Sequence, residues 1–80
     1  MKSAIGDIEN VEFKLGETVK VKISLKSIEG KLFVDCRKWY KFPNMEDYIA
    51  SSKGIMLSVR DWENILPYIG GMVEKNKAGV

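Results

Sequence analysis

Alternation between apolar and polar residues is the clearest pattern along this chain, and it is strongest over residues 19–26. Successive side chains of a β-strand point to opposite faces of a sheet, so this alternation predicts a strand with one apolar and one basic face. The apolar positions are Val19, Val21, Ile23 and Leu25, and the polar positions between them are Lys20, Lys22, Ser24 and Lys26.

Residues 32–40 are expected to pair with that strand as the second half of a hairpin. The segment 27–31 supplies the turn, and Gly30 suits a backbone position with positive φ. Because alternate residues of a strand share a face, Lys38 is placed on the apolar side. The aromatic and charged side chains of the other side should lie beside the lysines of residues 19–26. Leu32, Val34 and Cys36 form the apolar side, and Phe33, Asp35, Arg37 and Trp39 form the other, with Tyr40 at the strand end.

Weaker patterns flank this hairpin on both sides. Residues 1–10 are expected to form either a loose arm or a marginal first strand, and residues 11–15 alternate as a short strand. Residues 41–52 are expected to form a loop and residues 53–57 a short final strand. One binding domain is therefore expected over residues 11–75.

A helix is expected to follow, with Ser58 as its N-cap. Apolar residues then recur at helical spacing, which predicts one apolar stripe. Pro67 deletes a backbone hydrogen bond, so a kink is expected, and the helix either continues to about Lys75 or frays after Ile69. Residues 76–80 are expected to be a disordered tail. The stripe expected to form the core and a dimer contact consists of Trp62, Ile65, Leu66 and Ile69.

Composition argues against several classes of protein. Cys36 is the only cysteine and there is no histidine, so one chain builds neither a disulfide nor a Cys/His zinc site and has no imidazole base. The acidic residues lack metal-ligand spacing. We therefore expect no enzymatic activity, no metal and no cofactor. No apolar run approaches the ~20 residues that span a bilayer, and the N-terminus lacks the apolar core of a secretory signal. These features predict no membrane association and a location in the cytoplasm or nucleoid, or in the nucleus of a eukaryote.

The length of 80 residues allows one domain at most, which buries only a modest share of its surface. Domains this small are commonly stabilised by disulfides, metals or a partner chain. Since the composition argues against the first two, and the helix stripe holds more apolar residues than one small sheet needs, we expect a homodimer.

Charge is distributed unevenly along the chain. Residues 14–41 hold eight basic and three acidic residues, whereas the rest of the chain holds five basic and eight acidic residues. A basic centre between acidic flanks favours a polyanionic ligand, although lysines on a sheet edge also serve to block aggregation.

Cations and aromatic rings interleaved on one surface indicate a single-stranded nucleic acid as the ligand. Cations neutralise phosphates, and rings stack on bases that a duplex would hide. The alternative for Phe33 and Trp39 is a second apolar core or a dimer contact. Asp35 would repel a phosphate, so it is expected to orient Arg37 or a cross-strand lysine through a charge-assisted hydrogen bond.

Four short motifs occur in order along the chain: ISLK at 23–26, GK at 30–31, VDCRKWY at 34–40 and KGI at 53–55. Together with Trp62 they resemble the core of the transcriptional positive cofactor four family. The resemblance implies an α+β fold with a curved four-stranded antiparallel sheet and one C-terminal helix, dimerising through the helical side. It also implies non-enzymatic binding of single-stranded or melted DNA with little sequence preference.

Residue roles can be carried over by position from this resemblance. Ile28 and Glu29 depart from the family pattern, because a stacking phenylalanine and a basic residue are usual there. A minimal chain of this kind looks most like a bacterial or phage member. The residues that match DNA-contacting positions are the basic Lys26, Lys31, Arg37 and Lys53 and the aromatic Tyr40, with Trp39 before it.

The sequence therefore predicts a dimeric, largely sequence-independent single-stranded DNA-binding protein that acts in transcription, replication or recombination. Its expected partners are DNA, a second copy and replication or transcription proteins. An RNA-binding or strand-annealing protein, and a protein-interaction module for an acidic partner, are the alternatives. The expected phosphate contacts are Lys20, Lys22, Lys26, Lys31, Arg37 and Lys53, and the expected stacking residues are Phe33, Trp39 and Tyr40.

Overall fold

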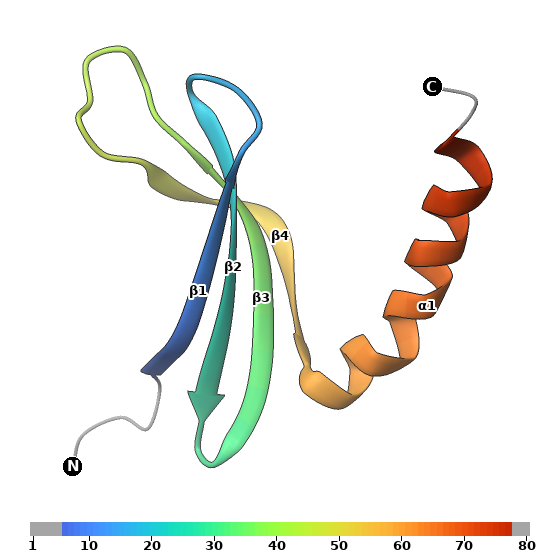
Figure 1. The fold of residues 1–80 in the computed structure, drawn as a ribbon. Coiled ribbons are helices and arrows are strands. Elements are labelled where there is room, and N and C mark those ends of the chain that lie inside the picture. Colours follow the sequence, from blue (N-terminus) through green and yellow to red (C-terminus); the bar gives the residue numbers. More distant parts are fainter. Residues whose placement is uncertain (1–5, 78–80) are drawn as a thin grey trace.

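The computed structural model describes residues 6–77, which form one antiparallel sheet and one helix (Figure 1). The strands lie side by side in chain order, β1-β2-β3-β4, and the sheet bends along its length. This α+β architecture confirms the expected fold class. The elements are β1 (Gly6–Lys14), β2 (Val19–Ile28), β3 (Lys31–Tyr40), β4 (Ile49–Ser58) and α1 (Val59–Asn76).

The β2–β3 hairpin forms as expected, with a two-residue turn between the paired residues Ile28 and Lys31. Glu29 and Gly30 both have positive φ, 52° and 84°, which is the backbone geometry of a type I′ turn. That turn matches the right-handed twist of the flanking strands, so it fixes the register of the whole hairpin.

Two strands extend further than the sequence pattern predicted. β1 begins at Gly6, so residues 6–10, expected as a loose arm or a marginal strand, pair with β2. An irregularity between Asp7 and Glu9 shifts the register there and interrupts the period of two. Residues 1–5 of the expected arm lie outside the described residues.

β4 begins at Ile49, not at Lys53, so the expected loop over 41–52 is shorter. Arg37 pairs with Gly54 and Trp39 pairs with Ala50, so two steps along β3 correspond to four steps along β4. This bulge hides the alternation by which a strand is recognised in a sequence.

Helix α1 begins where the sequence placed it. The Ser58 Oγ accepts a hydrogen bond of 3.1 Å from the Asp61 amide, which is N-cap geometry. The helix runs on through Pro67 to Asn76, so it does not fray after Ile69. Of the tail expected over residues 76–80, Asn76 is instead the last residue of α1 and Lys77 is its C-cap, and residues 78–80 lie outside the described residues.

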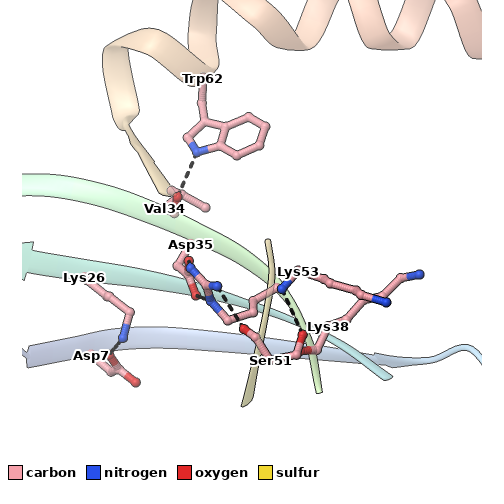
Figure 2. A network of polar contacts seen from close by, with 9 residues as sticks. Asp7, Lys26, Val34, Asp35, Lys38, Ser51, Lys53 and Trp62 are labelled. Atoms are coloured by element: carbon pink, nitrogen blue, oxygen red, sulfur yellow. Dashed lines mark hydrogen bonds and ion pairs between the residues drawn. The ribbon is translucent and has the colours of Figure 1, made fainter. Parts of the chain in front are cut away.

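The apolar side chains of β2 and β3 line a cleft together with side chains of α1, and the helix contacts β3 and β4. Figure 1 shows α1 to one side of the sheet, after β4. Trp62 makes the main polar link, because its indole nitrogen donates a 2.8 Å hydrogen bond to the Val34 carbonyl (Figure 2). Within residues 7–77, no apolar side chain is fully buried; the two buried residues are Ser24 and Asp35. An open apolar cleft of about 410 Å³ remains, lined by Ile23, Val34, Cys36, Trp62, Leu66 and Ile69.

Candidate nucleic-acid interface

The face of the β2–β3 hairpin opposite the cleft carries cations and aromatic rings together. Directly paired residues of neighbouring strands project from the same face, so the register fixes which side chains are neighbours. The register confirms the prediction that the lysines of β2, Arg37 and the two rings share one face, and Lys31 lies on the same face next to the turn. The facing pairs are Lys20 with Trp39, Lys22 with Arg37, Ser24 with Asp35, and Lys26 with Phe33.

Trp39 lies on this polar face, away from the helix. The ammonium nitrogen of Lys22 stands 4.5 Å from the centroid of the Trp39 ring, which is cation–π geometry. Phe33 and Trp39 are both partly exposed, and neither lines the apolar cleft. Phe33 and Trp39 therefore lie outside the apolar core that faces α1.

Arg37 is held in a fixed orientation by Asp35 and Ser51, both of which are labelled in Figure 2. Its Nε and Nη2 donate to the two carboxylate oxygens of Asp35 at 3.2 and 2.9 Å, and its Nη1 donates to the Ser51 carbonyl at 2.9 Å. This bidentate contact confirms the role expected for Asp35. The hydrogen bonds and the charge of Asp35 raise the pKa of Arg37 above its ordinary value.

Gly54 makes this arrangement possible, a role that was missed from the sequence. A Cβ atom at this position would lie 2.7 Å from the Arg37 Cα and Cβ atoms and from the Cys36 carbonyl oxygen. Only glycine therefore allows β4 to approach β3 so closely beside the Arg37 side chain. The signal was a glycine inside a strand pattern, which often marks a close backbone approach.

Two of the lysines already have acidic partners supplied by β1. Lys20 contacts Glu12 and Lys26 contacts Asp7, each with a nitrogen–oxygen distance of 2.8 Å. The hydrogen bond from Lys20, and its charge, lower the pKa of Glu12. These pairs were also missed, because finding Asp7 requires knowing that residues 6–10 extend the sheet. Lys22, Lys31 and Lys53 form no ion pair among residues 6–77.

Tyr40 and Lys53 form a separate group. The register pairs Tyr40 with Val19 and Ile49, so it lies on the opposite side of β3 from Trp39. The Lys53 ammonium nitrogen lies 5.8 Å from the centroid of the Tyr40 ring. The Lys53 amide also donates to the Ser51 hydroxyl, which itself donates to the Lys38 carbonyl and so fixes the β4 bulge (Figure 2). Of the nine residues predicted to contact DNA, seven therefore lie on the hairpin face, and Tyr40 and Lys53 lie elsewhere.

Three of the four helix residues expected in the core and the dimer contact line the apolar cleft. Trp62, Leu66 and Ile69 line the apolar cleft, whereas Ile65 does not. Within the described part of the chain, no three metal-ligating side chains gather in one place, and no helix has the length and apolar character needed to cross a bilayer.

Comparison with known proteins gives one structural match. The fold is similar to that of the solved structure of the bacteriophage T5 homolog of the eukaryotic transcription coactivator PC4, a protein implicated in recombination-dependent DNA replication. The TM-score is 0.64 over 88% of this chain and 83% of the phage chain. The two proteins share a fold. Their sequences are 12% identical, and no protein-family model and no curated protein sequence matches this chain.

Proposed function

We propose that this chain is a dimeric, non-enzymatic protein that binds single-stranded DNA with little sequence preference. The observation that carries the proposal is the alternation of cations and rings along one hairpin face. Lys22, Lys26 and Lys31 supply charge for phosphates, and Phe33 and Trp39 supply flat apolar surfaces for bases. Bases are available for such stacking only when they are unpaired, so the ligand is a single strand.

A second copy of the chain completes the core in this proposal. A domain normally buries its large apolar side chains, yet here Leu66 and Ile69 of the cleft remain 54% and 44% exposed. Both lie on the helix side of the molecule, away from the hairpin face. Pairing two helical sides would close both clefts and leave both hairpin faces open to DNA.

The process served by this binding is proposed from the structural neighbour. The phage T5 protein is implicated in recombination-dependent replication, so recombination and replication are the processes we favour, ahead of transcription. All three expose single strands at the chromosome, which fits a location in the cytoplasm or nucleoid, with replication or recombination proteins as further partners.

Salt dependence and one substitution test the proposal directly. We expect oligothymidine affinity to fall steeply between low and moderate salt, because each phosphate contact releases a counterion. Trp39→Ala should weaken binding by about 1–3 kcal/mol at every sequence, the cost of losing one stacked base. Trp39→Phe, which keeps a ring, is the matched control and should lose less. An affinity that is unchanged by salt would contradict the phosphate contacts.

The same titrations separate the alternatives. A matched RNA oligomer that displaces the DNA at equal concentration would favour the RNA-binding function, since stacking and phosphate contacts serve both polymers. If Trp39 fluorescence is unquenched by DNA but changes with an acidic protein partner, the interaction-module function is correct. Trp62 also emits, so the Trp39→Phe variant supplies the background signal.

A further inference from the structure

A third aromatic ring lies next to the hairpin face, in the loop between β3 and β4. The hydroxyl of Tyr48 donates a 3.2 Å hydrogen bond to the carbonyl of Glu17, which lies in the loop between β1 and β2. The Lys41 amide donates to the Thr18 carbonyl at 2.9 Å, so the same two loops are joined at their base. Tyr48 is therefore held in place although it lies in a loop, and its ring remains partly exposed.

Two cations stand close to this ring. The ammonium nitrogen of Lys20 lies 4.3 Å from the ring centroid of Tyr48, and that of Lys41 lies 5.5 Å from it. Both distances fall within the range of cation–π attraction. Lys41 forms no ion pair within residues 6–77, so its charge is available to a ligand.

Lys20 connects this loop to the hairpin face. It pairs directly with Trp39 across the β2–β3 register, while its ammonium group reaches the Tyr48 ring. Lys20 is thus a neighbour of both Trp39 and Tyr48. The arrangement repeats the pattern of the hairpin, in which Lys22 stands over the Trp39 ring.

We propose that Tyr48 and Lys41 form an additional nucleotide-binding position that extends the single-stranded DNA site beyond Trp39. A base stacks on the exposed part of the Tyr48 ring, and Lys41 contacts the phosphate beside it. This inference rests on the proposed function of the hairpin face. A role for Tyr48 as a loop anchor alone would need the hydroxyl and would not explain Lys41 at the ring, whereas Lys20 is also held by Glu12.

The test is a length series of oligothymidines of about 4 to 16 nucleotides, the range of site sizes for compact single-stranded DNA binders. The full-length protein is compared with Tyr48→Leu, which removes the ring, and Tyr48→Phe, which removes only the hydroxyl. We expect the wild type to gain affinity with length until the loop position is filled. Tyr48→Leu should stop gaining earlier and bind long oligomers about 5- to 150-fold more weakly, the equivalent of one stacked base.

Short oligomers that occupy only the hairpin face should bind Tyr48→Leu and the wild type equally. Tyr48→Phe loses the hydrogen bond to Glu17 but keeps a ring beside Lys20 and Lys41, so it should keep most of the length dependence. Equal losses at every length, or no loss at all, would overturn the proposal and leave Tyr48 as a loop anchor. Lys41→Ala supplies an independent measurement, because it should reduce the salt dependence of binding to long oligomers only. If the wild type binds no oligomer at any length, the proposed function itself fails, and that result is distinct from the others.

Discussion

The two faces of the sheet differ in how far a single chain completes them. On the hairpin face one polar cluster is complete within a single chain: Ser24 and Asp35 are buried, and the Arg37 guanidinium uses its Nε and both terminal nitrogens. On the helix side the apolar side chains remain incompletely buried, because Trp62 anchors α1 by one hydrogen bond and the cleft beside it stays open.

This difference indicates which part of the proposed function depends on the proposed dimer. Fixed side chains lose little conformational freedom when a ligand binds, so under the proposed function the hairpin face needs no second copy to be ordered. The apolar side gains its burial energy only when something covers it. The largest effects on stability should therefore come from the helix side, and smaller, ligand-specific effects from the hairpin face.

The first prediction concerns Ile69, which lines the cleft. Ile69→Lys should place an uncompensated charge in the core of the proposed dimer and reduce its stability by about 3–5 kcal/mol. Sedimentation should show a monomer, and the melting temperature should lose its dependence on protein concentration. Tyr68→Lys, on the adjacent and 73% exposed residue, is the control and should remain dimeric. A dimer that survives Ile69→Lys would place the interface elsewhere.

The second prediction concerns the contact between β3 and β4. Gly54→Ala should force the two strands apart, because its Cβ would meet backbone atoms of β3 at 2.7 Å. We expect a loss of about 3 kcal/mol in the free energy of unfolding, the upper end for overpacking, measured by urea denaturation. Gly16→Ala is the control, since its Cβ would meet only Val19 at an ordinary 3.5 Å. Equal stability of the two variants would contradict the close approach.

Much of this architecture could be predicted from the sequence, because regular alternation and capping are local signals. The β2–β3 hairpin, its polar face and the Ser58 cap all follow from residue spacing. The β1 extension and the β4 bulge could not, since a register shift moves side chains to the other face and breaks the alternation.

The candidate interface was predictable to the same degree. The alternation of residues along the two strands predicted the face that carries cations and rings, and the role of Asp35. It could not predict contacts between segments that are distant in the sequence. The pairing of Asp7 with Lys26 and of Tyr48 with the Glu17 carbonyl spans strands or loops whose register is set by the folded sheet. Tyr40 was grouped with Trp39 by resemblance to a family, and the register separates the two.

The smallest expected effect lies on the hairpin face, where Glu12 competes with phosphate for Lys20. Glu12→Gln should free that lysine, raise oligothymidine affinity by up to about fivefold, and increase the salt slope by about one. Glu63→Gln on α1 is the control and should change neither quantity.

The effect of Glu12 should also depend on pH in a defined direction. Lys20 lowers the pKa of Glu12 below its ordinary 4.5, so the ion pair is fully formed above pH 4.5 and is lost as the pH falls through the lowered value. As the pH falls through this value, the oligothymidine affinity of the wild type should rise toward the affinity of Glu12→Gln. The affinity of Glu12→Gln should show no such pH-dependent rise. Thymine does not titrate in this range, so oligothymidine isolates the protein's contribution. A difference between the two proteins that persists below the lowered pKa would show that Glu12 acts through the fold of β1 and not through its charge.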